Sequence, residues 1–248
     1  MGPILAVLIL AAAGYFIYVD TNKIGNIGPG IEGTGEAIVD VEQMPLTEGV
    51  PAPGLNRPLV FSAPDLTSEL TEFYKQNIEK LVSALKSDPK QIDKWLELGL
   101  LYKQIGDYAG AEEVWKYIAE VSSEKVIVYG NLGDLYQFYI KNYPKAEDYM
   151  KKVIALKPDN VAGYRALYDL YTLSYKEKMP EALKTLSSGL AKNPDNYDLL
   201  VLTASYYKMV GDKVNAKIYY EKALAVADKA GMAVAKQAIE DEISNLSK

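Results

Sequence analysis

The stretch from Trp95 to Trp115, WLELGLLYKQIGDYAGAEEVW, decides the fold of this chain. Leu98 and Tyr102 stand four residues apart, as on one face of a helix, and the turn dipeptide Gly106-Asp107 follows them. The same two residue types recur at spacings of 34, 35 and 36 residues, as Leu132, Leu167, Tyr136, Tyr171 and Tyr207. A period of this size indicates helix pairs stacked into an open array rather than a closed globule.

Small residues recur where the two helices of each pair should cross, because only small side chains allow helix axes to approach closely. The two longer units place their extra residues in the turn between the helices and begin the second helix near Pro144 and Pro180, where a first-turn proline costs no hydrogen bond. The crossing residues are Gly99, Gly133 and Ala204 on the first helices and Ala111, Ala146 and Ala216 on the second helices.

These units resemble the tetratricopeptide repeat. That pattern places Trp, Leu, Gly and Tyr on the first helix, then Ala, an aromatic, a small residue and Pro on the second. Four units over residues 92–228 carry the pattern in register, with departures at Ser123, Tyr168, Thr203 and Asp228. The resemblance implies an all-α, right-handed superhelical solenoid of stacked helix pairs that binds a protein or peptide partner.

Both flanks of the array are predicted to be helical. Residues 65–91 form a leading helix, a half repeat that starts at Pro64-Asp65 and carries an apolar stripe including Leu66, Phe73 and Ile78. Residues 229–248 form a capping helix with a polar outer face, as the end of a solenoid requires.

The beginning of the chain is strongly apolar. Residues 3–19 carry no charge, and at about 1.5 Å per residue a helix of this length is near the lower limit for crossing a bilayer. We therefore expect residues 1–20 to form an N-terminal transmembrane helix that anchors the chain. Two alternatives are a cleaved secretory signal, with Ala11-Ala12-Ala13 as a crude cleavage site, and a buried helix.

Residues 21–64 are predicted to form an acidic tether between this anchor and the array. The segment contains 7 Gly and 6 Pro, which exclude long regular structure. A single apolar segment behind a short N-terminus is the arrangement of a signal anchor, and a chain without Cys is safe in an oxidising compartment. We expect a single-pass protein of the cell membrane whose array lies outside the cytoplasm.

Several functional classes are disfavoured by composition. The chain has no His and no Cys, so the usual metal ligands, imidazole bases and thiol nucleophiles are missing. No phosphate-binding loop or dinucleotide motif occurs. The chain contains 27 basic and 33 acidic residues, and most of the acidic excess lies before the array. The array itself is therefore nearly neutral, and nucleic acid is not an expected partner. We expect no enzymatic activity, no catalytic residues, no metal and no cofactor.

The resemblance also implies where a partner binds, because ligands of this family lie along the concave face made by the first helix of each unit. Carried over by position, that face offers polar groups that form a candidate binding groove: Lys103, Gln104, Asn131, Asp134, Gln137, Arg165, Asp169 and Lys208. The family's clamp for C-terminal carboxylates is not expected, since only Asn131 among its positions has the required type.

The sequence thus predicts a membrane-anchored scaffold that binds partner proteins or peptides and helps assemble a complex. One alternative is a structural subunit packed in a homo-oligomer or an envelope complex. Another is a secreted soluble binding protein, if the first segment is cleaved. The partner and the oligomeric state stay open.

Overall fold

The chain divides into two units, Met1–Gln43 and Met44–Lys248. The computed structural model describes residues 9–10 and 16–17 of the first unit and residues 49–246 of the second. In the first unit, β1 (Ile9–Leu10) and β2 (Phe16–Ile17) pair antiparallel, with Ile9 opposite Ile17. The predicted helix over residues 1–20 is therefore wrong at these four positions, and the rest of that span lies outside the described residues. Among the described residues, none of the helices combines the length and apolar character needed to cross a membrane.

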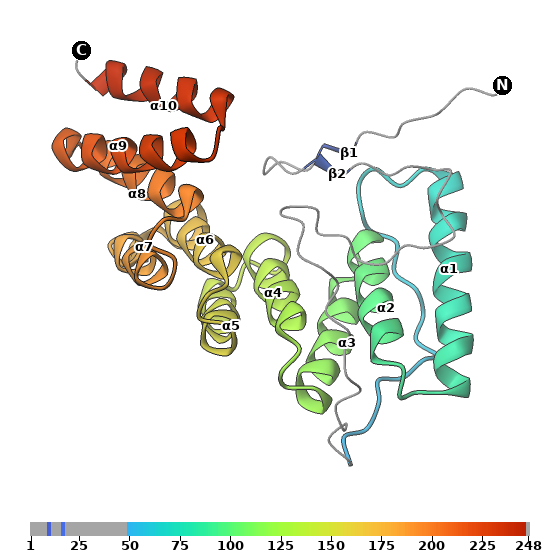
Figure 1. Ribbon diagram of the computed structural model, residues 1–248. Helices are drawn as coiled ribbons and strands as arrows, with labels where there is room; N and C mark the ends of the chain where they lie inside the picture. The colour runs from blue at the N-terminus through green and yellow to red at the C-terminus, as the bar shows by residue number, and fades with distance from the viewer. Residues whose placement is uncertain (1–8, 11–15, 18–48, 247–248) are drawn as a thin grey trace. The chain divides into compact units, whose positions relative to one another are not determined.

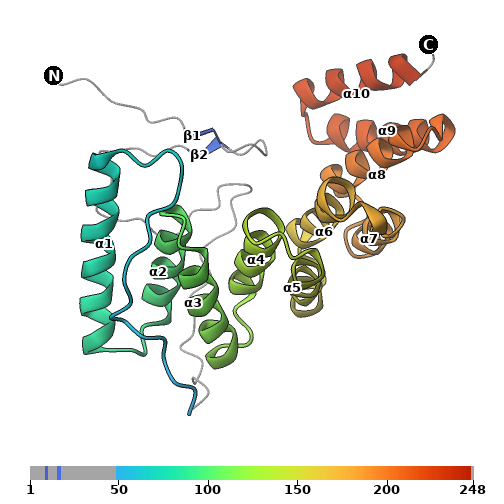
Figure 2. The ribbon, with the colours of Figure 1, turned by 180° about the vertical axis from the view of Figure 1, so that it is seen from behind.

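The second unit is an all-α array of stacked helix pairs, as the repeat predicts (Figures 1 and 2). Consecutive helices pack against each other along its whole described length. In chain order the elements are α1 (Ser68–Ser87), α2 (Ile92–Gln104), α3 (Tyr108–Val121), α4 (Val126–Asp134), the π-helix η2 (Leu135–Tyr139), α5 (Tyr143–Leu156), α6 (Val161–Asp169), the π-helix η3 (Leu170–Ser174), the 3₁₀-helix η4 (Lys176–Lys178), α7 (Glu181–Lys192), α8 (Tyr197–Met209), α9 (Lys213–Lys229) and α10 (Ala233–Leu246).

The turns of the first and fourth pairs form as their dipeptides predict. Gly106 and Gly211 adopt left-handed backbone with φ of 85° and 84°, which ends the first helix of each pair. The carboxylates of Asp107 and Asp212 then accept hydrogen bonds from the backbone N–H groups three residues later, of Gly110 and Asn215, and start α3 and α9.

The two longer pairs insert their extra residue differently from the prediction. Their first helices end in π-helical turns, η2 and η3, whose starts are 35 residues apart. In each turn a backbone N–H reaches the carbonyl five residues back, from Ile140 to Leu135 and from Tyr175 to Leu170. The insertion thus begins inside the helix, before the connecting turn.

The leading helix begins later than predicted. Thr67 caps α1 by accepting a hydrogen bond from the Leu70 N–H, so Pro64-Asp65 is not its start. Ile78, Leu81 and Leu85 of the predicted stripe are buried, whereas Phe73 is exposed.

Within residues 49–246, the core consists of two clusters. The larger one runs from α1 to α8 and contains both tryptophans, Trp95 and Trp115, which are fully buried. The smaller one joins α8, α9 and α10 through Leu200, Tyr220 and Ile239. Gly99 allows a close approach of the helices, as predicted. The group that it accommodates is the Trp115 ring, because an added Cβ at Gly99 would lie 2.3 Å from the indole nitrogen.

The described end of the tether, residues 49–64, packs against the array in an extended conformation. From Pro53 to Ala63 partly buried and exposed residues alternate, as on a strand. Leu55, Leu59 and Phe61 contact the core, and the N–H groups of Ser62 and Ala63 both donate to the Ile105 carbonyl. This part of the predicted tether does not act as a free linker.

Candidate functional site

The first helices of the pairs, α2, α4, α6 and α8, lie on the inner side of the curve of the helical unit, and α3, α5 and α7 lie on its outer side (Figures 1 and 2). Seven of the eight candidate groove residues lie on these first helices, and Gln137 lies on η2, which continues α4. The structure therefore places the candidates on successive first helices, and binding itself remains a prediction.

Lys103 and Asp134 connect the first two units. The Lys103 ammonium lies 2.7 Å from the Asp134 carboxylate and 5.4 Å from the centre of the Tyr139 ring. Tyr139 in turn packs against Tyr108. Because the lysine already has both a carboxylate and a ring as neighbours, it offers a positioned cation to a ligand only if it exchanges one of them.

Arg165 and Asp169 face the same side of α6, one helical turn apart. Burial raises the pKa of Asp169, and the positive charge of Arg165 opposes this rise. Asn131, on α4, is partly buried, and its amide nitrogen is itself buried without a hydrogen-bond partner among the described residues. Arg165 is therefore the exposed charged group among these three candidates.

The other three candidates already have partners within the array. Gln137 is buried, and its amide donates to the Ser174 hydroxyl at 3.0 Å, so it links η2 to η3 and is not available on the surface. Gln104 accepts a hydrogen bond from the Tyr74 hydroxyl. Lys208 forms an ion pair with Glu242 of α10.

An exposed apolar position that recurs in three units, called the apolar ridge below, was not recognised in the sequence. Phe138, Leu173 and Met209 are all exposed, and they stand 35 and 36 residues apart at the same position near the end of their first helices. The exposed fraction of Leu173 reaches 61%. The sequence carried a signal for this feature, because large apolar residues recur at one repeat position where the first unit has Gln104.

A second feature that the sequence reading missed links neighbouring units through carboxylates. Glu112 of α3 accepts a hydrogen bond from the Tyr136 hydroxyl of the next unit, and Glu147 of α5 does the same with Tyr171. Burial, with the neighbouring Glu112 carboxylate, raises the pKa of Tyr136 to about 12. The pair recurs after 35 residues, so these hydrogen bonds are repeated junctions of the array.

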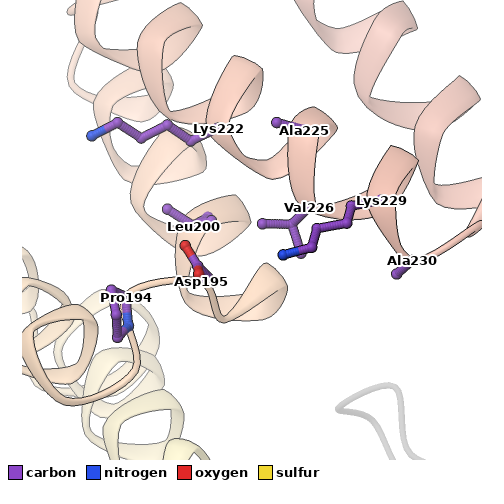
Figure 3. A pocket seen from close by; sticks show the side chains of 8 residues that line it. All are labelled: Pro194, Asp195, Leu200, Lys222, Ala225, Val226, Lys229 and Ala230. Atoms are coloured by element: carbon purple, nitrogen blue, oxygen red, sulfur yellow. The ribbon is translucent and has the colours of Figure 1, made fainter.

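A pocket of about 710 Å³ opens beside the fourth unit (Figure 3). Its floor is apolar, with Leu200 from α8 and Val226 from α9, and Lys222 and Lys229 extend along its rim. The remaining lining residues are Pro194, Asp195, Ala225 and Ala230. In the described part of the chain, His, Cys, Asp and Glu form no group of three that could hold a metal ion.

Comparison with known proteins agrees with this architecture. Residues 126–160, which span α4, η2, α5 and the loop before α6, match the family model of the tetratricopeptide repeat. The crystal structure titled MamA is 22% identical, covers 67% of this chain and 98% of its own, and superposes with a TM-score of 0.52. A second MamA structure, also 22% identical, covers 66% and 88% with a TM-score of 0.53.

A structure of pilF from Pseudomonas aeruginosa is 16% identical, covers 71% of this chain and 85% of its own, and has a TM-score of 0.50. At these identities the structural likenesses show the fold alone. No curated protein matches the chain in sequence.

Proposed function

We propose that this chain, a member of the tetratricopeptide repeat family, is a scaffold that binds partner proteins on the inner surface of its helical array and is anchored to the cell membrane by its N-terminal segment. An open array of stacked pairs offers a long surface and is the usual form of a protein-binding module. The structures of MamA and pilF resemble this fold over two thirds of the chain or more.

The observation that carries the proposal is the ridge of Phe138, Leu173 and Met209 beside the polar groups of the same helices. Exposed apolar side chains that recur at one position of successive units, on helices that also carry charges, are typical of a surface that a partner covers. Arg165, an exposed residue of α6, adds a cation to this surface. A partner segment that is mainly apolar with a few acidic groups suits this surface.

Site-specific photo-crosslinking in cells tests this proposal. A photoreactive phenylalanine at Leu173 should capture a partner, whereas the same residue at Lys184, on the outer helix α7 and 80% exposed, should not. The double substitution Asn131→Ala with Arg165→Glu should reduce capture from position 173. Equal capture from both positions, or capture that the double substitution leaves unchanged, would place the binding surface elsewhere.

A structural subunit that packs with copies of itself is the second candidate, and the same exposed ridge favours it. Sedimentation of the full chain over a range of concentrations distinguishes the two. The scaffold stays monomeric at micromolar concentration, whereas a subunit that packs through the ridge self-associates and loses this association in Leu173→Lys.

Membrane anchoring is supported by the absence of charge over residues 3–19. If the array lies outside the cytoplasm, a cysteine introduced by Thr34→Cys reacts with a membrane-impermeant thiol reagent on intact cells. Labelling only after lysis would place the array in the cytoplasm. N-terminal sequencing of the mature protein separates an uncleaved anchor from a secreted binder.

A further inference from the structure

Three units of the array share an aromatic residue that closes the junction with the preceding unit. The ring N–H of Trp95 donates to the Pro89 carbonyl at 2.8 Å. In the next two units, the hydroxyls of Tyr129 and Tyr164 donate to the carbonyls of Ser123 and Pro158 at 2.9 and 2.8 Å. In each case the acceptor stands six residues before the ring.

The fourth unit lacks this ring. The equivalent position is Leu200, and the equivalent acceptor, six residues earlier, is Pro194. None of the hydrogen bonds within the described residues uses the Pro194 carbonyl. Both residues line the pocket of about 710 Å³, so the pocket opens where the other units hold an aromatic side chain.

The surroundings of the absent ring are retained. In the second unit the Lys152 ammonium lies 5.0 Å from the centre of the Tyr129 ring, and in the first unit the Tyr117 ring meets Trp95 edge-on at 5.2 Å. The matching residue of α9 is Lys222, on the rim of the pocket (Figure 3). Without a ring in the pocket, its ammonium lies 4.7 Å from the ring of Tyr219.

We propose that this pocket binds a tyrosine or tryptophan side chain from a segment of a partner protein. The ring would rest on Leu200, Ala225 and Val226, and its O–H or N–H would donate to the Pro194 carbonyl, as the internal rings do in the other units. Lys222 is placed to lie over the ring face. Two lysines and one aspartate at the rim favour acidic residues beside the aromatic one.

This site belongs to the edge of the array between the third and fourth units, not to its inner surface. It extends the proposed scaffold function by a specific anchor for a peptide. Substitutions in the pocket should leave crosslinking from position 173 unchanged, so the failure of one proposal is distinguishable from the failure of the other.

Methyl NMR of the full chain tests the pocket directly. N-acetyl-tyrosinamide should shift the methyl signals of Leu200 and Val226 through the ring current. N-acetyl-phenylalaninamide, which has no donor, should bind roughly fivefold more weakly, as expected for the loss of one hydrogen bond. N-acetyl-leucinamide should bind more weakly still. Methyl shifts that are absent, or equal for the tyrosine and phenylalanine amides, would overturn the proposal.

Two substitutions provide matched controls. Leu200→Tyr supplies the missing ring from within the chain and should abolish the shift of Val226 while raising the melting temperature. Ala225→Glu changes only an exposed residue of α9 and should block the pocket without altering the core. A response to the tyrosine amide that persists in both variants would contradict the assignment.

Peptides test whether the partner segment is acidic and whether the ring comes from a partner protein or from a second copy of this chain. A tyrosine flanked by two acidic residues on each side should bind more tightly than one flanked by lysines, and Lys222→Ala with Lys229→Ala should remove the difference. Equal binding of the two peptides would refute the acidic partner. Shifts of Leu200 and Val226 that grow with protein concentration without any peptide would assign the occupant to a second copy of this chain instead.

Discussion

Glu147 is the most buried carboxylate of the repeat junctions, with 4% of its surface exposed. It accepts hydrogen bonds from the Tyr171 hydroxyl at 2.9 Å and from the Lys178 ammonium at 2.7 Å, and it pairs with Lys151. Burial by itself would raise the pKa of Glu147, but these three donors outweigh it and hold the pKa below its usual 4.5.

This lowered pKa predicts a pH dependence. The unfolded carboxyl binds protons more readily than the folded one, so its contribution to stability is present above pH 4.5 and is lost as the pH falls through the lower, folded pKa. Glu147→Gln should cost about 1–3 kcal/mol at neutral pH and flatten the acid side of the stability profile. Urea titrations at several pH values measure both effects. Glu112→Gln, the more exposed equivalent one unit earlier, should cost less; an equal cost would contradict the role of burial.

The glycines at the helix crossings differ in what surrounds them. A Cβ on Gly99 would collide with the fused ring of Trp115, which is rigid and fully buried. A Cβ on Gly133 would meet the flexible side chain of Met150 at 3.0 Å. Gly99→Ala should therefore cost about 1–3 kcal/mol or more through overpacking, and Gly133→Ala clearly less. Thermal melts of the two variants that coincide would disprove this difference.

At the scale of elements, the extended segment 49–64 behaves as a part of the array. Arg57 holds it in place: its guanidinium lies 3.1 Å from Asp107 and from Glu113 and stacks over Tyr102 at 5.3 Å. Asp107 is buried and also caps α3, so the arginine balances a charge that the turn between α2 and α3 needs.

Removing this arginine should release the segment. We expect Arg57→Ala to cost about 1–3 kcal/mol, because Asp107 loses its ion pair in a buried position. The amides of Ser62 and Ala63, which donate to Ile105, should lose protection in hydrogen exchange, and residues 50–63 should become sensitive to protease. Lys184→Ala, which removes an exposed ion pair on α7, is the control. Unchanged exchange at Ser62 and Ala63 would show that Arg57 does not fix the segment.

The sequence predicted the elements whose signals repeat and missed those defined by contacts. Leu98, Tyr102 and their equivalents predicted the helix pairs, and Gly106-Asp107 predicted a turn that the structure confirms. The docking of residues 49–64 depends on Arg57 reaching Asp107, a contact fifty residues apart that composition does not reveal. Gly and Pro residues suggested a free tether, although the alternation of Leu55, Arg57, Leu59 and Phe61 was a signal of one buried side.

The candidate groove was predictable only in part for a similar reason. Repeat position correctly predicts that Lys103, Asn131 and Arg165 lie on first helices. It does not predict that Gln137 turns inward to Ser174, because η2 begins at Leu135 and changes the direction of the side chains after it. The sequence shows that the fourth unit has Leu200 where the other three units have an aromatic residue. Whether a pocket opens there depends on how α9 packs, which the sequence does not show.

At the scale of the molecule, the array is divided by its two hydrophobic clusters. The larger cluster holds α1 to α8, and the smaller one holds α9 and α10 against one side of α8. In an array where each unit contacts only its neighbours, stability is a sum of local terms, and a small terminal cluster is expected to open first. The smaller cluster contains three alanines among its seven buried residues, so it buries little apolar surface per residue.

Both tryptophans of the chain, Trp95 and Trp115, lie in the first pair, so their fluorescence reports on the larger cluster alone. Circular dichroism reports on all helices. In urea, the loss of helix signal should therefore begin before the change in tryptophan fluorescence. Ile239→Ala, which removes a buried side chain of α10, should cost about 2–5 kcal/mol within the smaller cluster. The early loss of helix signal should then occur at a lower urea concentration. The fluorescence midpoint should not change. If both probes instead give one coincident transition in the parent and shift together in Ile239→Ala, the array unfolds as a single cooperative unit and the division is refuted.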